Sequence, residues 1–460
     1  MSGEHGISYR VPGGTNFMTK NFDAAALAHQ IKDLPITYFI FGLSSGAAGD
    51  RYLAPHPKFK ELGMRAVTPK DVDTTTYHYS NNNNDESQNL NLEEYDDIDV
   101  FDDFLTEMAK INVKVIAYLN AEGPAKLKHG EDSAFDYTYN STFNKNRAGF
   151  NTGGYFVNSS VAACQELDGV NECSPSARKW IKWVAQKYDI PYIFSDAYVD
   201  GSQLNKALKH AYANIVVEHY AEKYGNRIAG FWFDAGAYGN STEIFAAVRR
   251  HNPDAAIAYN GAGAKIPLQN NNVQGEDFTS GHMTPLVASG GKTNPPDGCY
   301  NYGLVLSAES SIDGYVYAGV EPSTNLALTT TTLNPYIDPS FKIQYTQDLN
   351  PSLAHVYLPA QEKWNSGDLI WNDSQASEWM DRITSAKGAF TWAVRRSGCG
   401  GCTILNYYDQ STIHHEDFQF LKRVYSSLPL PSSHEYQFNA TNCDCLSESG
   451  TSEALSWGCK

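Results

Sequence analysis

Strand-length apolar runs alternate with amphipathic helical stretches along most of this chain. The runs are rich in β-branched and aromatic residues, and between them apolar positions recur every three or four residues. Strands are expected at 36–43, 113–120, 191–195, 228–234, 255–260, 314–318, 355–358, 389–394 and 403–407. Because this alternation is typical of parallel βα units, the sequence predicts an α/β protein built as a (β/α)8 TIM-type barrel.

The expected helices lie between these strands, and three irregular insertions interrupt the pattern. The helices are expected at 100–110, 177–188, 204–224, 242–249, 374–386 and 415–428. The insertions, rich in Asn, Gly, Ser or Pro, are 74–94, 131–172 and 290–301. Loops after barrel strands build active sites, so the insertions indicate walls of an extended substrate cleft, or else decoration without substrate contact. We expect residues 1–428 to form the catalytic barrel and 429–460 a short Cys-rich tail.

Charge and hydropathy narrow the possible partners. The chain carries 52 Asp and Glu against 35 Lys and Arg, a formal net charge of −17. Nucleic acids and anionic membranes favour clustered cations, so neither is expected as the main partner. Apolar runs stay well short of the roughly 18 to 20 residues of a membrane span.

Cysteines and glycosylation sequons suggest export. The eight cysteines crowd into Gly-, Ser- and Asn-rich loops, where structural disulfides are expected. A redox or metal-binding role for the Cys399 and Cys402 pair is the alternative. Sequons begin at Asn140, Asn158, Asn240, Asn372 and Asn439. We therefore expect a secreted, glycosylated protein whose signal peptide has been removed, with no metal site and no cofactor.

The most informative stretch is IAGFWFDAGAYGNSTEIF, which begins at Ile228. A buried strand ends in Asp234, and small residues then turn the chain and leave room for a ligand. A strand-end carboxylate among aromatic residues suits nucleophilic attack on an anomeric carbon, because the transition state resembles an oxocarbenium ion. The alternative is that Asp234 caps the following helix.

A second catalytic group is expected from another strand end. The segment 275–282 places Glu276, Asp277 and His282 close together in the sequence. A carboxylic acid can protonate a leaving oxygen, and so can a histidine, whose unperturbed pKa is about 6.5. Each of the three has a structural role in the loop as its alternative.

The order of these motifs resembles the α-L-fucosidases of glycoside hydrolase family 29 and the related endo-acting fucan hydrolases. The matching motifs are Tyr224-Gly225, Trp232-Phe233-Asp234-Ala235, Asn252-Pro253-Asp254, Tyr259-Asn260-Gly261, Glu276-Asp277-Phe278 and Ile404-Leu405-Asn406. The resemblance spans about 21–428 and implies a barrel in which Asp234 is the nucleophile. By analogy with the endo-acting enzymes His282 is the first candidate for the acid/base, and by analogy with family 29 Glu276 is the second.

The departures from this pattern favour an endo-acting enzyme. Exo-fucosidases of this type carry a Lys-His-His-Asp-Gly-Phe run that grips the terminal fucose, where this chain has Gly42-Leu43-Ser44-Ser45-Gly46. The β-sandwich common after their barrel also has no counterpart. The expected function is therefore a retaining hydrolase of fucose-containing, sulfated polysaccharide; an exo-α-L-fucosidase and an inactive carbohydrate-binding barrel are the alternatives.

Substrate contacts are expected from cations and aromatic rings near the strand ends. A sulfate-binding wall, or else a solvated loop of mixed charge, is expected at Arg51, Lys58, Lys60, Arg65 and Lys70. Candidate sugar-stacking rings are Trp232, Tyr259, Trp364 and Trp392, each with core packing as its alternative. Asn260 and Asp277 complete the set of expected substrate contacts.

Overall fold

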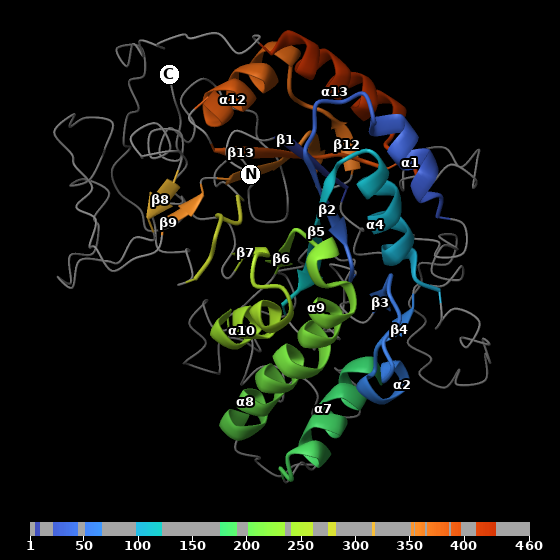
Figure 1. The fold of residues 1–460 in the computed structure, drawn as a ribbon, viewed down its shortest axis with the longest axis vertical. Coiled ribbons are helices and arrows are strands. Elements are labelled where there is room, and N and C mark those ends of the chain that lie inside the picture. Colours follow the sequence, from blue (N-terminus) through green and yellow to red (C-terminus); the bar gives the residue numbers. More distant parts are fainter. Residues whose placement is uncertain are drawn as a thin grey trace, which may run out of the picture.

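A seven-stranded, wholly parallel sheet forms the centre of the protein (Figure 1). Its strands, in spatial order, are β10 (His355–Pro359), β13 (Ala389–Ala393), β1 (His5–Tyr9), β2 (Tyr38–Gly42), β5 (Lys114–Asn120), β6 (Gly230–Asp234) and β7 (Ala256–Tyr259). This is the order along the chain read as a circle, because β1 pairs with both β2 and β13. A sheet in which the first and last strands along the chain pair with each other, and the others follow in sequence on either side, has the strand order of a curled, barrel-like sheet.

The computed structural model describes most of the central framework and part of the connections. The described residues are 5–9, 22–44, 51–66, 98–121, 175–190, 201–234, 241–260, 275–281, 315–317, 351–353, 355–363, 366–385, 388–396 and 411–428.

The segment 275–281 lies between the two outer strands, β7 and β10. On one side the Asp277 N–H donates to the Ile257 carbonyl over 2.9 Å, and on the other the Tyr357 N–H donates to the Gly281 carbonyl over 2.9 Å. Gly281 has a φ of +81°, and a Cβ there would lie 2.7 Å from the Tyr357 nitrogen, so only glycine fits. With this segment in place, hydrogen bonds run around the whole circuit of the sheet.

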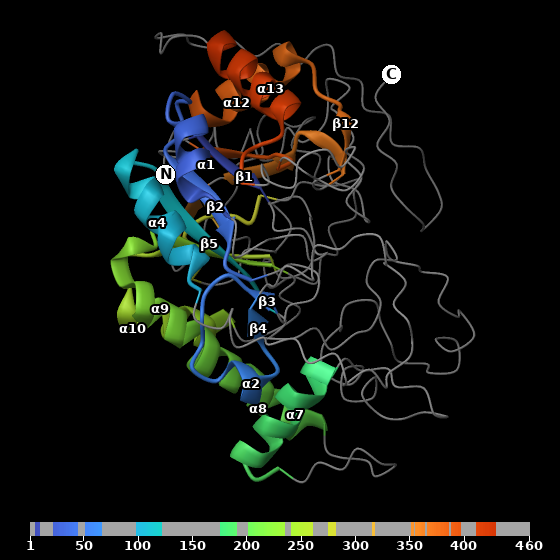
Figure 2. The same cartoon turned by 90° about the vertical axis from the view of Figure 1, so that its right-hand side faces the viewer.

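Helices cover the outside of the curled sheet, as the side view shows (Figure 2). They are α1 (Ala24–Ile31), α4 (Val100–Lys110), α9 (Glu218–Tyr224), α10 (Ser241–His251), α12 (Asp373–Ser385) and α13 (His415–Ser427). Helices α2 (Phe59–Leu62), α7 (Pro175–Lys187) and α8 (Gly201–Ala211) lie beyond one end of the sheet (Figures 1 and 2). A π-helical turn, η4 (Tyr212–Val217), joins α8 to α9, and a 3-10 turn, η5 (Gly225–Arg227), follows α9. Among the described residues no helix is long and apolar enough to cross a bilayer.

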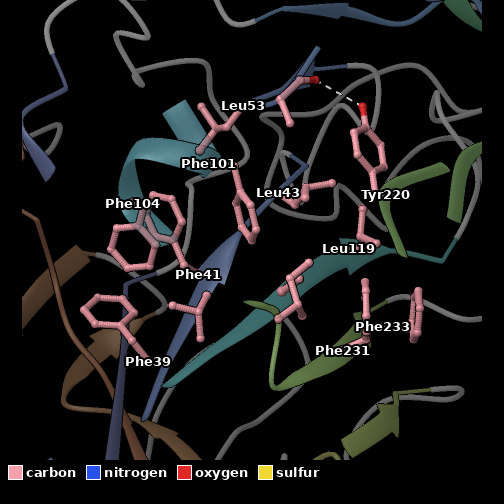
Figure 3. Packing of buried hydrophobic residues seen from close by; sticks show 14 of the residues in the cluster. Phe39, Phe41, Leu43, Leu53, Phe101, Phe104, Leu119, Tyr220, Phe231 and Phe233 are labelled. Carbon is pink, nitrogen blue, oxygen red and sulfur yellow. Dashed lines mark hydrogen bonds between the residues drawn. The ribbon is translucent and has the colours of Figure 1, made fainter. Parts of the chain in front are cut away.

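Alternate residues of each strand face two different cores. The outward set packs against the helices and is almost entirely apolar, with Phe39, Phe41, Phe231 and Phe233 at its centre (Figure 3). The inward set fills the interior with a mixture of aromatic, small apolar and polar side chains and includes Tyr118, which belongs to a separate buried cluster. The period of two that separates these sets is the ordinary consequence of pleating.

Most expected elements are present, and the differences have local causes. The expected strand at 314–318 is β8 (Tyr315–Tyr317), but it pairs antiparallel with β9 (Pro351–Leu353) outside the main sheet. Strand β1 and helix α1 were not expected, because both are short and lack a clear repeat. Small two-stranded sheets also form from β3 (Arg51–Tyr52) with β4 (Arg65–Ala66), and from β11 (Gln361–Lys363) with β12 (Ser366–Leu369).

Several expectations fall outside the described residues. These are the strands at 191–195 and 403–407, the three insertions, all eight cysteines, the tail at 429–460, and every sequon asparagine except Asn372. Asn372 is exposed and accepts a hydrogen bond from the Gln375 N–H over 2.8 Å, so it caps α12.

Candidate active site

Asp234 is the last residue of β6 and points into the interior, where only 6% of its surface is exposed. Each of its carboxylate oxygens has a donor. The Tyr118 hydroxyl donates to Oδ2, and the Asn260 amide donates to Oδ1 over 2.8 Å. A buried carboxylate held at both oxygens has a defined orientation, which a reacting group requires.

The two donors come from the strands on either side of β6. Asn120 of β5 is the register partner of Asp234, and Tyr118 is two residues earlier on the same inward face. Asn260 directly follows β7, and its N–H donates to the Phe233 carbonyl over 2.7 Å. The carboxyl ends of three adjacent parallel strands thus converge on one carboxylate, at the edge where barrel enzymes place their chemistry.

Aromatic side chains in the interior of the sheet pack against Tyr118. The Trp232 indole stacks on the Tyr118 ring, with centroids 5.2 Å apart, and its N–H donates to the Ser280 carbonyl over 3.0 Å. The Tyr357 ring packs edge-on against Trp232 at 5.4 Å, and its hydroxyl is 2.7 Å from the Ser8 hydroxyl. Trp232 is fully buried, so in this structure it positions Tyr118 and is not a surface for sugar.

A second tyrosine holds the end of β5 from the outside. Tyr212 begins the π-helical turn η4, and its hydroxyl donates to the Asn120 carbonyl. The Asn120 N–H donates to the Ser44 hydroxyl over 3.0 Å. Burial, helped by the nearby Tyr259, raises the pKa of Tyr212 well above its usual value, so this hydroxyl keeps its proton. Helical turns of the π type are frequent beside functional sites.

Sequence reasoning did not select Tyr118 or Tyr212. Tyr118 shares an inward face with the strand-end Asn120, and that period-two relation is a usable signal. Tyr212 has no comparable signal, because its role depends on how a helix packs against a strand end far away in the chain.

Glu276 and Asp277 lie along the edge of β7 that does not pair with β6. A Glu276 oxygen accepts from the Tyr259 N–H over 2.6 Å, and an Asp277 oxygen accepts from the Ile257 N–H over 2.8 Å. Asp277 also forms an ion pair with Arg249 at 2.7 Å. Both carboxylates therefore accept hydrogen bonds from N–H groups of β7 that would otherwise go to the carbonyls of a neighbouring strand.

The other expected site residues are spread over several environments. Tyr259 faces outward, against Phe245 of α10. Trp392 also faces outward and is fully buried against Trp371 and Phe420. Arg51 lies in β3, and its side chain is not described; His282, Trp364 and Lys70 lie outside the described residues.

The chemistry available here is that of a carboxylate at a strand end. Among the described residues no group of three or more His, Cys, Asp or Glu side chains is arranged to hold a metal ion. Asp234, oriented by a phenol and an amide, is suited to act as a nucleophile or as an electrostatic stabiliser of developing positive charge.

Solved structures with a similar fold include enzymes that act on fucose polymers. Endo-fucoidan hydrolase MfFcnA4 from glycoside hydrolase family 107 is matched over 93% of this chain and 52% of its own, with a TM-score of 0.56 and 16% identity. Endo-fucoidan hydrolase P5AFcnA, of the same family, is matched over 93% and 91% of the two chains, at 0.53 and 15%. An α-L-fucosidase from Paenibacillus thiaminolyticus is matched at a TM-score of 0.43 and 13% identity, over 92% and 73% of the two chains.

The two likenesses with TM-scores above 0.5, both to endo-fucoidan hydrolases, show the fold of the chain. It spans about half the length of MfFcnA4 and most of P5AFcnA. No family model and no curated protein matches the sequence. The chain therefore shares the fold of the two endo-fucoidan hydrolases.

Proposed function

We propose that this protein is a retaining glycoside hydrolase that cleaves internal linkages of a fucose-containing, sulfated polysaccharide. The observation that carries the proposal is Asp234, buried at the carboxyl end of β6 and hydrogen-bonded at both oxygens. Support also comes from the fold shared with the endo-fucoidan hydrolases and from the motif order around Asp234. On this proposal residues 1–428 form the catalytic barrel, and the protein is exported.

The proposed reaction has two steps. In the first step Asp234 attacks the anomeric carbon while a separate acid/base residue protonates the leaving oxygen; the glycosidic bond breaks and a glycosyl-enzyme forms. In the second step the acid/base residue removes a proton from water, which attacks the anomeric carbon and releases the sugar from Asp234. We assign the acid/base to His282 before Glu276. His282 directly follows Gly281, the carboxyl-terminal residue of the segment 275–281 between β7 and β10. Glu276, in contrast, already accepts a hydrogen bond from the Tyr259 N–H.

Four residues of the expected binding set have other roles in this proposal. Trp232, Tyr259, Trp392 and Asp277 support the barrel through the contacts given above, and we retain Asn260, Arg51 and Trp364 as substrate contacts. Asn260 is the one of these whose side chain is described; it bonds to Asp234 and retains 7% exposure.

The test is to incubate the protein with a panel of sulfated fucans and resolve product sizes by gel electrophoresis. We expect short oligosaccharides; free fucose would indicate exo action, and binding without new reducing ends would indicate an inactive barrel. Asp234→Asn should reduce turnover at least about 10³-fold while the melting temperature stays close to that of the wild type. Activity retained by this variant would end the assignment of Asp234.

A further inference from the structure

Two neighbouring helices carry a charge opposite to that of the rest of the chain. Helix α7 contains four cations, namely Arg178, Lys179, Lys182 and Lys187, and α8 contains two, Lys206 and Lys209. Neither helix contains an Asp or Glu, although the whole chain has 52 acidic residues against 35 basic ones. Together the two helices hold six Lys and Arg, although Asp189, Asp196 and Asp200 lie in the sequence between them. This local excess of cations in so acidic a protein indicates an anionic partner.

The structure brings these helices together with a third basic element. Helix α7 packs between α8 and α2. The side chains of Lys179, Lys182 and Lys206 are exposed, and so is that of Lys58, just before α2. Among the described residues the arginines of α10 and α13 are ion-paired, whereas no ion pair is seen for Lys179, Lys182 or Lys206.

An aromatic ring lies within this basic surface. Trp183 of α7 is half-buried and stacks parallel to the buried Trp180, with ring centroids 6.0 Å apart. The Lys58 ammonium lies 5.5 Å from the centre of the Trp183 ring. A half-buried indole surrounded by cations can contact the apolar face of a sugar while the cations bind its sulfate groups.

The surface stands beyond the edge of the sheet where Asp234 lies. The Tyr212 hydroxyl reaches the Asn120 carbonyl at the carboxyl end of β5, and α8 precedes Tyr212 in the same helical run. The eleven residues of α8 form a helix about 16 Å long that leads away from this contact. Both views show α7 and α8 projecting from one end of the molecule, beyond the sheet (Figures 1 and 2).

We propose that the α2–α7–α8 surface binds a sulfated polysaccharide and guides it toward the catalytic edge. The inference rests on the proposed function for its substrate class, but its test measures binding alone. A polysaccharide is favoured over a nucleic acid because a half-buried indole lies among the cations. In addition, α8 continues into the π-helical turn whose Tyr212 contacts the end of β5, the strand next to Asp234.

The test compares two triple variants in an Asp234→Asn background, so that no ligand is consumed. The first combines Lys179→Gln, Lys182→Gln and Lys206→Gln. The matched control combines Lys32→Gln, Lys110→Gln and Lys422→Gln, which are exposed, lie elsewhere and lower the net charge equally. Glutamine keeps helix propensity close to that of lysine, and melting curves check that both variants fold.

Binding is measured by affinity electrophoresis with a sulfated fucan, the same polymer after desulfation, and double-stranded DNA. We expect the first variant to bind sulfated fucan at least about tenfold more weakly, with a shallower salt dependence, and the control to bind like its parent. The proposal would be overturned if the first variant bound sulfated fucan like its parent, or if the control were weakened equally. It would also be overturned if desulfation did not weaken binding, or if DNA bound as tightly as fucan. A wild-type chain that cleaves no fucan would end the proposed function but leave this comparison intact.

Discussion

The two faces of the central sheet use the same strands in different ways. The outward face presents Phe39, Phe41, Phe231 and Phe233 to the helices and is stabilised by apolar contact area. The inward face presents aromatic rings with polar groups, such as Tyr118 and Trp232, whose hydrogen bonds lead to Asp234.

The difference separates stability from chemistry along each strand. Burial of hydrocarbon is nondirectional, so the outward face determines how strongly the sheet and helices are held together. Hydrogen bonds are directional, so the inward face determines where Asp234 points. Substitutions on the two faces should therefore change different measurable quantities.

The largest expected effect in this comparison is on stability, at Phe41. Its ring stacks on Phe104 of α4 with centroids 3.9 Å apart, and it is fully buried. Phe41→Ala should lower the free energy of unfolding by about 3 to 5 kcal/mol, as measured by urea denaturation. Ile40→Val, one position along on the inward face, is the control and should cost about 1 kcal/mol. A loss below about 2 kcal/mol in Phe41→Ala would contradict the role given to apolar contact on the outward face.

A pH-dependent loss of stability should follow from His56, which packs among the outer-layer aromatic residues. The Lys58 N–H donates to its Nδ1, so its Nε2 carries the hydrogen that points to the Ile215 carbonyl of the π-helical turn. Burial, the largest cause, lowers the pKa of His56 to about 4 from its ordinary value of 6.5. The unfolded chain therefore binds a proton more readily than the native one.

Stability should fall as the pH drops from about 6.5 toward 4, by up to about 3 kcal/mol, and His56 should add no further loss below that range. Urea denaturation at several pH values measures the slope, and His56→Gln should flatten it. An unchanged slope in this variant would show that other groups control the acid sensitivity.

On the inward face the main expected effect is on rate. Tyr118→Phe removes the hydroxyl that donates to Asp234 and keeps the ring that stacks on Trp232. The loss of a hydrogen bond to a carboxylate should lower kcat about ten- to hundredfold in reducing-end assays on fucan. Tyr357→Phe removes a hydroxyl bonded to Ser8 in the same interior, and it should leave kcat nearly unchanged. Equal losses in both variants would point to general disruption of the interior.

The smallest effect is expected at Tyr259, which the sequence motif places beside Asn260 but which faces Phe245 on the outside. Tyr259→Phe should change kcat and KM by less than about twofold, because the ring that packs against Phe245 is kept. A clear rise in KM for fucan would return Tyr259 to the set of substrate contacts.

Much of the outer layer could be predicted from the sequence, because apolar runs and helical repeats are local patterns. Six of the seven sheet strands were expected within two residues of both ends. The seventh, β1, is five residues long and gains its stability from pairing with β2 and β13, which are close in space but far apart in the chain.

Local sequence patterns are enough to predict the alternation of strands and helices and the position of Asp234 at a strand end, since both depend on neighbouring residues. Which groups meet that carboxylate depends instead on the packing of segments that are far apart in the chain. Tyr118 and Asn260 reach it through the register of three parallel strands, and Tyr212 supports the site through a helix packed against β5. Tertiary structure also decided that Trp392 faces the helices, because the direction of a side chain depends on which face of its strand the fold turns outward.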